Sequence, residues 1–328
     1  MAGGGGLVPV IHAATERRAD ELDTIVATKA VASALKRAGF ATRIIALGPN
    51  LIELDRLRPL RPLAVFNLVD AVKGDGRLAP SVPARLDALG LHYTGCGTSA
   101  WIDTLSKIAT KERLVQNCLP TPAWSEDGNA LDPGASVIVK PVWEHGSLGL
   151  DENSVMLGAD AAEAIAARNS KWRTDHFAES FIEGREFNLA LLEGPSGVEV
   201  LPVAETIFEG PAAAAPKIVG YDAKWVPDSE FYIGTPRRFG LERDEPELAV
   251  RLKQLARSCW SLFDLSSYAR VDFRVDQQGQ PFILEVNMNP CLSPDAGFAA
   301  SAAEAGLGYD AMVGRIVESS LGALRATA

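Results

Sequence analysis

Four polar residues near the C-terminus have the types and the spacing of a site that binds cations and stabilises negative charge: Arg270, Asp272, Glu285 and Asn287. They alternate with apolar residues in two segments, 268–275 and 281–287. A period of two is typical of strands with one polar and one apolar face. The connection between the segments, 277–280, has a length that is common in hairpins. We therefore expect an antiparallel pair of strands.

Pairing Asp276 with Pro281 fixes the register of this hairpin. Asp272 then lies opposite Glu285 and Arg270 opposite Asn287, while the other face pairs Val271 with Val286, Phe273 with Leu284 and Val275 with Phe282. Two facing carboxylates repel each other unless a cation neutralises them. Magnesium takes one or two carboxylates and completes its shell with phosphate oxygens, so the polar face predicts a magnesium site. The alternative is the solvated outer face of an edge hairpin.

A lysine and a glycine-bearing loop follow another apolar strand. Lys140 ends the segment 136–140, and Glu144-His145-Gly146-Ser147-Leu148-Gly149 comes shortly after it. Glycine lets backbone N–H groups approach phosphate oxygens, and a lysine supplies a positive charge beside them. The combination predicts a phosphate-binding loop. A surface lysine next to an ordinary hairpin would have the same pattern.

The elements that position these groups fall into three parts. In the first hundred residues we expect strands at 7–11, 42–47, 63–68 and 91–93 and helices at 20–37 and 81–89. This alternation implies a parallel sheet covered by helices, and an α/β fold class. A helix at 102–117 then leads to Leu119-Pro120-Thr121-Pro122, where two prolines interrupt regular structure.

The two later parts are mixed. The smaller one has expected strands at 136–140 and 178–182 and a helix at 161–169. The last part is expected to hold strands at 187–192 and 198–204, a weakly periodic segment at 207–240, a helix at 245–263, the hairpin and terminal helices.

Composition excludes several classes of protein. Among 328 residues, 42 are acidic and 32 basic, which gives a net charge of −10 and argues against a groove for nucleic acid. No apolar stretch reaches the roughly 20 residues that cross a bilayer. The N-terminal residues lack the basic start and apolar run of a secretion signal, so we expect a cytoplasmic protein without membrane contact.

Other motifs are absent or isolated. The cysteines and histidines are scattered, which argues against structural zinc and a disulfide framework. Gly95–Ala100 fits a loose dinucleotide pattern after a short strand, but no second strand ending in Asp or Glu follows about 20 residues later, so we interpret it as a turn. The sequence has no G-x-x-x-x-G-K-[ST] for a Walker-type ATPase and no G-x-S-x-G for a serine hydrolase.

Four blocks occur in a characteristic order: Lys107 ahead of Leu119–Pro122, Ile138–Pro141 with its glycine loop, Glu179–Phe187, and Arg270–Asp272 paired with Glu285–Pro290. Together they resemble the ATP-grasp ligases, and specifically the D-alanine–D-alanine ligase-like group. Val65–Asp70 and Tyr93–Gly95 resemble that group's N-terminal domain. The resemblance implies an N-terminal Rossmann-like domain (1–98), a central ATP-grasp lid domain (99–186) and a C-terminal ATP-grasp catalytic domain (187–328), with ATP clasped between the last two.

The resemblance implies roles on the nucleotide side. Lys107 and Lys140 would contact the ATP phosphates or adenine, together with the loop residues Glu144, Gly146 and Ser147. Glu179 would accept a hydrogen bond from the adenine amino group, beside the backbone of Phe181 and Ile182. Glu186 would hold the ribose hydroxyls.

It also implies metal ligands and catalytic residues. Asp272, Glu285 and Asn287 would bind two Mg²⁺ ions, with Mn²⁺ as an alternative. Arg270 would stabilise negative charge on an acyl phosphate and a tetrahedral intermediate, and Lys224 matches a lysine on a mobile loop that closes over the phosphates. The family's substrate-facing serine falls on Gly146, with Ser147 adjacent. These roles suit phosphoryl transfer to a carboxylate, because cations must offset the repulsion between anions.

The substrate side departs from the D-alanine enzymes. Val69–Gly76 replaces their His-Gly-x-x-Gly-Glu-Asp-Gly stretch, Ser293–Gly297 replaces the hydroxyl residues that hold the acceptor carboxylate, and Trp225 replaces a tyrosine. A product other than D-alanyl-D-alanine is therefore expected. Asp295 would suit an amino-bearing substrate, or it caps a helix. His145 lines the acyl pocket or caps the loop, and Glu16 faces the first substrate or belongs to an acidic helix start.

We expect an ATP-dependent ligase that joins a small-molecule carboxylate to an amine through an acyl phosphate. The resemblance also implies a homodimer. Two alternatives stay open. One is an ATP-binding sensor that kept the cleft but lost ligation, and the other is an ATP-grasp enzyme that uses another nucleophile or closes a ring within one substrate.

Overall fold

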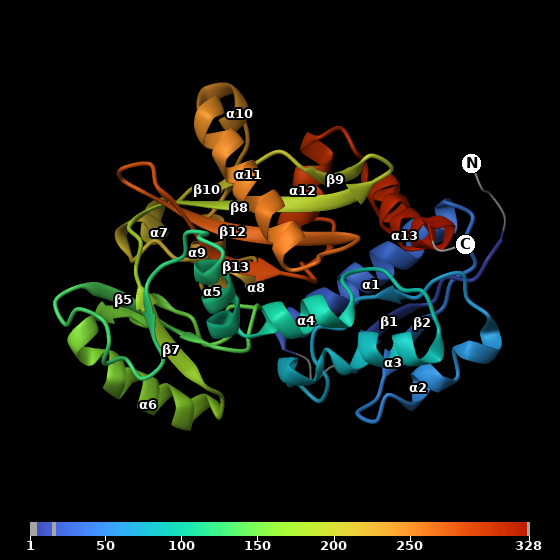
Figure 1. The fold of residues 1–328 in the computed structure, drawn as a ribbon, viewed down its shortest axis with the longest axis horizontal. Coiled ribbons are helices and arrows are strands. Elements are labelled where there is room, and N and C mark those ends of the chain that lie inside the picture. The colour runs from blue at the N-terminus through green and yellow to red at the C-terminus, as the bar shows by residue number, and fades with distance from the viewer. Residues whose placement is uncertain (1–4, 15–17, 327–328) are drawn as a thin grey trace.

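The N-terminal part of the computed structural model, which describes residues 5–14 and 18–326, is a parallel sheet with helices around it (Figure 1). Strands β1 (Val10–Ala13), β2 (Ile44–Leu47) and β3 (Phe66–Asn67) are ordered β2-β1-β3, and both pairs are parallel. The helices are α1 (Ala19–Arg37), α2 (Ile52–Asp55) and α3 (Ser81–Leu89). The parallel α/β arrangement expected for this part is confirmed. The expected strand at 91–93 is reduced to a single bridge between Val65 and Tyr93.

The middle part is a small antiparallel sheet, drawn in green in Figure 1. Its strands are β4 (Trp124–Ser125), β5 (Ser136–Pro141), β6 (Val155–Leu157) and β7 (His176–Ser180), in the order β4-β7-β5-β6. Helix α6 (Ala161–Trp172) packs on it through a compact apolar cluster that includes Val139, Ile165 and Ala178.

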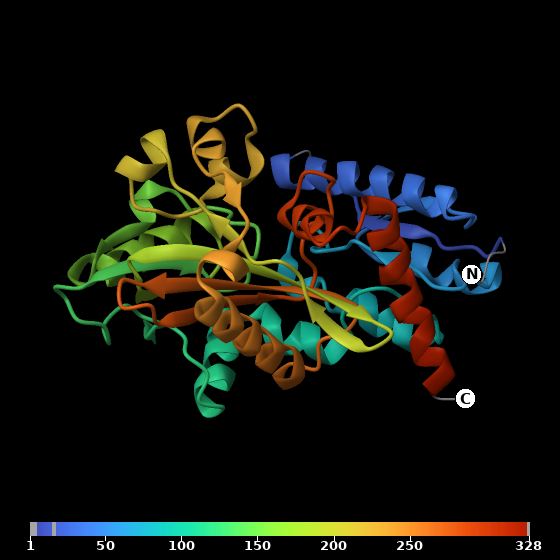
Figure 2. The same cartoon turned by 90° about the horizontal axis from the view of Figure 1, so that it is seen from above.

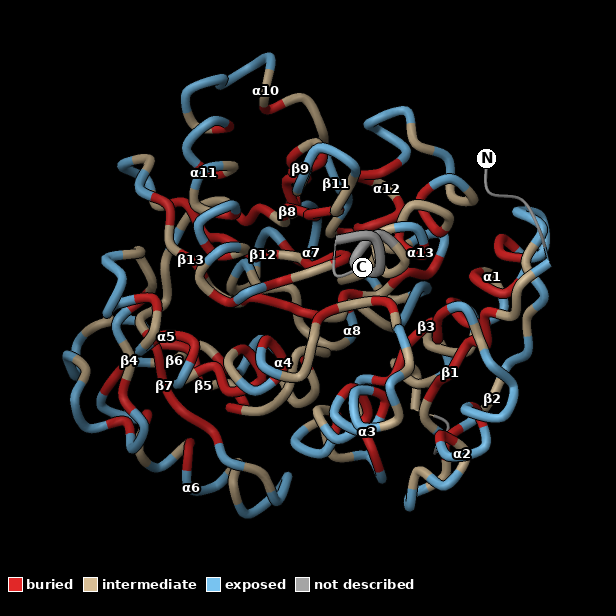
Figure 3. Tube along the Cα trace, turned by 45° about the vertical axis from the view of Figure 1, so that its right-hand side comes forward, coloured by how far each residue is buried: buried red, intermediate tan, exposed pale blue. Residues whose placement is uncertain are grey.

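The C-terminal sheet carries most of the core. Its strands are β8 (Gly184–Gly194), β9 (Gly197–Val200), β10 (Ala204–Thr206), β11 (Arg237–Arg238), β12 (Tyr268–Asp276) and β13 (Pro281–Asn287). The order is β11-β10-β8-β12-β13, with β9 paired to β8. Helices α10 (Leu241–Asp244) and α11 (Pro246–Leu262) lie on one side, and α12 (Gly297–Glu304) and α13 (Tyr309–Ala326) on the other (Figure 2). In Figure 3, buried residues follow the strands, whereas the chain around α10 is largely exposed.

The single helix expected at 102–117 is wrong, because two helices replace it. Helix α4 (Thr98–Leu105) ends before Ser106, and α5 (Lys107–Gln116) begins after it. Ser106 has an extended backbone, and its hydroxyl accepts a hydrogen bond from the N–H of Ala109. A serine in this position caps a new helix and so ends the previous one.

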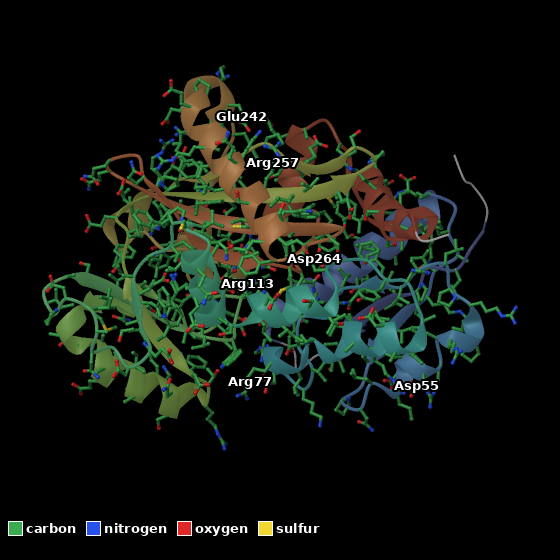
Figure 4. All side chains as sticks on the ribbon, viewed as in Figure 1. Asp55, Arg77, Arg113, Glu242, Arg257 and Asp264 are labelled. Carbon is green, nitrogen blue, oxygen red and sulfur yellow. The ribbon has the colours of Figure 1, made fainter. Side chains whose placement is uncertain are left out.

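Both of these helices pack on the C-terminal sheet, although we assigned them to the central domain. Trp101 and Leu114 belong to the same core as Phe273 of β12. Arg113, labelled in Figure 4, donates to the carbonyl of Leu262 at the end of α11 (3.0 Å) and lies over the ring of Phe263. The division at 98/99 and 186/187 stays a prediction.

The hairpin register is confirmed at the residues that matter for the site and wrong beyond them. Arg270 pairs with Asn287, Val271 with Val286 and Asp272 with Glu285. A bulge then shifts the pairing, so that Phe273 faces Ile283 and Val275 faces Pro281, instead of the predicted Leu284 and Phe282. One extra residue in β13 turns the following side chains to the opposite face, and Leu284 consequently lines the cleft described below.

The weakly periodic segment 207–240 contains three short helices, α7 (Gly210–Ala214), α8 (Tyr221–Trp225) and α9 (Glu230–Ile233). Four further single turns of 3₁₀ helix lie at Arg58–Leu60, Gly76–Leu78, Glu152–Ser154 and Gly158–Asp160. Within the described residues, no helix has the length and apolar character that crossing a membrane would require.

Candidate active site

A cleft runs between the middle sheet and the C-terminal sheet, and most of the predicted residues line it. From the nucleotide and catalytic sets it contains Lys107, Lys140, Glu144, Ser147, Glu179, Phe181, Ile182, Glu186, Lys224, Arg270, Asp272 and Glu285. Gly146 and Asn287 line a second pocket, which meets the first at His145, Lys224, Trp225 and Arg270. Segments far apart in the sequence are thus gathered around one continuous space.

A buried ion triad lies at the middle-sheet end of the cleft. Glu179 of β7 is 2.5 Å from Lys140 of β5 and 2.7 Å from Lys111 of α5, and Glu179 and Lys111 are almost fully buried. Burial alone would raise the pKa of Glu179, but the two lysine charges outweigh it and lower that pKa. Glu179 is therefore ionised. We did not predict Lys111 as a site residue; its signal was its position one helical turn after Lys107.

Lys107 lies one turn before Lys111 on α5, beside Glu285. Its Nζ is 3.4 Å from Glu285 and donates to the carbonyl of Glu144 in the glycine loop. His145 Nδ1 is 3.3 Å from the other oxygen of Glu285. Burial would raise the pKa of Glu285, yet Lys107 and His145 hold it well below the ordinary value.

Arg270 and Asp272 form a two-pronged ion pair on β12. Arg270 Nε and Nη2 lie 2.7 and 2.8 Å from the two oxygens of Asp272, and Asn188 of β8 donates to the same carboxylate (2.9 Å). Parallel hydrogen bonds of this kind fix orientation as well as charge. Arg270 is consequently held at the junction of the two pockets.

The donor set on β12 and β13 fits a hard divalent cation. Asp272 and Glu285 are paired across the strands, and Asn287 is paired with Arg270; its amide oxygen accepts from the N–H of Asn289 (2.9 Å) and keeps a second lone pair for a cation. Magnesium is commonly bound by one or two carboxylates and completed by substrate phosphates. Within the described ranges, no three His, Cys, Asp or Glu residues are placed to hold a metal ion by themselves. A cation at Asp272 and Glu285 would accordingly need ligands from a phosphate.

The segment 218–225 docks onto the glycine loop. Lys224 Nζ donates to the carbonyl of His145 (3.1 Å), Trp225 Nε1 to that of Gly146 (2.6 Å), and Ser147 Oγ to that of Val219 (3.1 Å). Burial and the charge of Arg270 lower the pKa of Lys224. These contacts place Lys224 over the cleft beside the hairpin residues.

Glu186 occupies the far end of the cleft, next to an arginine that we did not predict. Burial raises the pKa of Glu186, and the charge of Arg274, 3.6 Å away, opposes that rise. Arg274 continues the alternation of Arg270 and Asp272 along β12, which was the sequence signal for it.

Acidic residues outnumber basic ones on the wall of the second pocket: Asp20, Glu21, Asp23, Asp70 and Glu144 line it together with Arg18, Lys224 and Arg270. Asp70 lines this pocket and is exposed to solvent at residue level; loss of hydration on the pocket wall and the charge of Glu144 raise its pKa to about 7. Asp23 accepts hydrogen bonds from the thiol of Cys291 and, through its carbonyl, from Ser293.

Two predicted substrate residues need separate comment. Asp295 lines the first cleft with an exposed side chain, and its carbonyl accepts from Arg237 (2.9 Å). The alternative that Asp295 caps a helix is wrong, because α12 begins after Ala296. Glu16 lies outside the described residues.

The comparison with protein families decides the class of this chain. The family described as D-ala D-ala ligase C-terminus matches residues 132–318. The chain belongs to the D-alanine–D-alanine ligase-like group of ATP-grasp carboxylate–amine ligases. The expected resemblance, ATP-grasp fold and enzyme class are thereby confirmed.

Relatives of this ligase support the same membership. A Chromohalobacter salexigens protein named D-alanine–D-alanine ligase is 30% identical, with 97% of this chain and 95% of that protein covered. A Sinorhizobium fredii protein named uncharacterized protein y4sG is 32% identical over 88% of this chain and 85% of its own length. A crystal structure of the Bacillus anthracis D-alanine–D-alanine ligase complexed with ATP shares the fold, with a TM-score of 0.77, 19% identity and coverage of 99% of this chain and 100% of that chain.

Proposed function

We propose that this ligase uses ATP and a divalent cation, Mg²⁺ or alternatively Mn²⁺, to phosphorylate a small-molecule carboxylate and join it to an amine, with release of ADP and phosphate. The observation that carries the proposal is the position of Arg270. Its guanidinium stands between a cleft lined by lysines and acids and a second pocket that opens onto the same atoms. A phosphoryl group transferred from a nucleotide in the first cleft to a carboxylate in the second pocket would pass beside this guanidinium.

The nucleotide would occupy the first cleft. Glu179 would accept from the adenine amino group, because a carboxylate that already binds two lysines keeps unused lone pairs. The backbone of Phe181 and Ile182 would lie alongside, and Glu186 would hold the ribose. Lys107, Lys140 and Lys224 would face the phosphates with the glycine-loop residues Glu144, Gly146 and Ser147.

The chemical step would take place around the hairpin. Asp272, Glu285 and Asn287 would hold the divalent cations, which neutralise charge on the transferred phosphoryl group. Arg270 would stabilise the acyl phosphate and the tetrahedral intermediate, and Lys224 would add a second positive charge. In the structure, two hydrogen bonds from Arg270 to Asp272 orient the guanidinium beside these residues before any substrate binds.

The second pocket would take the acceptor, and its charge favours an amine over an amino acid with a free carboxylate. Within the described residues, Asp23, Asp70 and Glu144 have no ion-pair partner at 4 Å or less. An anionic acceptor group would be repelled by them. We therefore propose a product other than D-alanyl-D-alanine. His145 and Trp225, which line both pockets, would face this substrate, and Asp295 would approach it from the first cleft. The substrate role of Glu16, the homodimer and the cytoplasmic location stay predictions.

Phosphate release tests the proposal. The protein is incubated with ATP, with and without Mg²⁺, against a panel of carboxylates combined with amino acids, small diamines and amino alcohols. Release that requires Mg²⁺, a carboxylate and an amine supports the ligase. Release without any amine indicates another nucleophile or ring closure, and tight ATP binding without release indicates a sensor. Asp295→Ala is expected to raise the acceptor KM while ATP-dependent turnover persists; an unchanged acceptor KM removes Asp295 from the substrate site.

A further inference from the structure

The geometry points to Arg274 as a positioning residue that couples the nucleotide end of the cleft to the segment that carries Lys224. This inference rests on the proposed ATP site. Arg274 lies on β12, directly across from Glu186 on β8, and its side chain is only 4% exposed. A charge buried to this extent needs specific partners, because burial without them is costly.

The partners of Arg274 come from the connection between the two sheets. Its Nη1 donates to the carbonyl of Gly184 (3.1 Å), its guanidinium lies 5.1 Å from the ring centre of Phe181, and its Nε is 3.6 Å from Glu186. The segment 181–186 runs from the end of β7 to the start of β8. Three of its residues, Phe181, Ile182 and Glu186, line the cleft and would touch adenine and ribose.

The same guanidinium reaches the other side of the cleft. Its Nη2 donates to the carbonyl of Lys217, and the ring of Phe208 lies 6.0 Å away. Phe208 and Lys217 belong to the segment 207–240, whose later part places Lys224 and Trp225 on the glycine loop. Only a planar fork with several donors can serve two carbonyl oxygens and a carboxylate from three directions.

The planar guanidinium of Arg274 thus fixes the positions of both the segment 181–186 and the beginning of the segment 207–240. Nucleotide bound against 181–186 would shift the docking equilibrium of the Lys224 segment toward the docked position. Docking would raise the affinity for nucleotide by the same factor, because coupling between two sites is reciprocal. Arg274 touches no reacting atom in this scheme. It acts through Glu186 and Lys217.

The test compares wild type, Arg274→Met, Arg274→Lys and Arg185→Met. Arg185 is the matched control: it neighbours Glu186 on β8, binds two carboxylates at 2.7 Å and lies over Phe187, but it is absent from the cleft wall. Two quantities are measured, namely the Kd for ATP with Mg²⁺ by calorimetry, and the rate of tryptic cleavage after Lys217 and Lys224 with and without ATP. Circular dichroism checks folding.

In wild type, ATP is expected to slow cleavage after both lysines. Arg274→Met is expected to raise the ATP Kd about tenfold or more and to abolish the protection even at saturating ATP, since hydrogen bonds from a charged donor are lost. Arg274→Lys, which keeps a charge opposite Glu186 but not the fork, should recover part of the affinity and little of the protection. Arg185→Met should match wild type in both.

The outcomes separate the two proposals. Wild type that does not bind ATP refutes the proposed function. Wild type that binds ATP, with Arg274→Met equal to it in affinity and protection, refutes only the coupling. If Arg274→Met does not fold, Arg274→Lys decides: full protection with a lysine contradicts the role of the fork, and lost protection with retained ATP binding supports it.

Discussion

Lys111→Met is expected to lower the free energy of unfolding by about 3 kcal/mol, because it removes one of the two lysines that neutralise Glu179. Taking one partner from a buried ion pair costs about 3–5 kcal/mol when the other charge is left alone. Here Lys140 stays 2.5 Å from Glu179, which sets the expected value at the lower end. Lys111 also loses hydrogen bonds to Thr121 Oγ1 (2.9 Å) and to the carbonyl of Pro122 (3.1 Å).

Urea unfolding of four proteins measures this value: wild type, Lys111→Met, Glu179→Gln and the double variant. If the ion pair causes the loss, the double variant should lose less than the sum of the single variants, with a coupling of about 1–3 kcal/mol. Lys171→Met is the control, since Lys171 is exposed over Trp172 and its loss should change stability by less than about 0.5 kcal/mol. A Lys111→Met effect below about 1 kcal/mol at an unchanged urea slope, or additive variants, would refute the reasoning.

Three further predictions concern the cleft. Glu285→Gln should lower phosphate release at least about 100-fold and raise the Mg²⁺ requirement, whereas Asp276→Asn, at the end of β12 and outside the cleft wall, should not; a loss below tenfold contradicts the metal role. Asp70→Asn should stabilise the protein at pH 8 and leave its stability unchanged at pH 4. A carboxyl whose pKa is raised to about 7 contributes its full stability below its ordinary pKa and loses that contribution as the pH rises through 7. Equal urea midpoints for both proteins at pH 8 contradict this. Mn²⁺ should bind weakly alone and more tightly with ADP, as followed by electron paramagnetic resonance; equal affinity without nucleotide contradicts the need for phosphate ligands.

The sequence predicted the parts of the fold in which local pattern and tertiary contacts agree. Helix α1 could be placed from its apolar spacing and from its acids at the start and bases at the end, and the hairpin from strict alternation. The break at Ser106 and the bulge opposite Asp272 were missed. Both depend on what the chain packs against. The hydrophobic period of the sequence is almost the same with or without a helix break at Ser106, and with or without one extra residue in β13.

The candidate site shows the same division. Residues on regular strands, such as Lys140, Asp272 and Glu285, fall on the cleft because strand alternation fixes the side to which they point. Lys111 and Arg274 were missed although the spacing puts them on the same faces as Lys107 and Asp272. The pattern shows the face of a charged residue but not its partner, and here Glu179, or Gly184 and Lys217, come from distant segments.

The ion pairs of the cleft also suggest how its charges would be rearranged by ligands. The two acids of the hairpin that line the cleft are each matched to a basic group: Asp272 to Arg270, and Glu285 to Lys107 and His145. If Asp272 and Glu285 turn to divalent cations, Arg270 and Lys107 lose their partners while phosphate oxygens arrive beside them. The positive charges that neutralise these acids are then the charges that the transferred phosphoryl group needs, so exchanging partners costs less than burying either set of charges alone. In the proposed reaction, Arg270 and Lys107 would thus balance the acids of the cleft before nucleotide binds and contact phosphate oxygens afterwards.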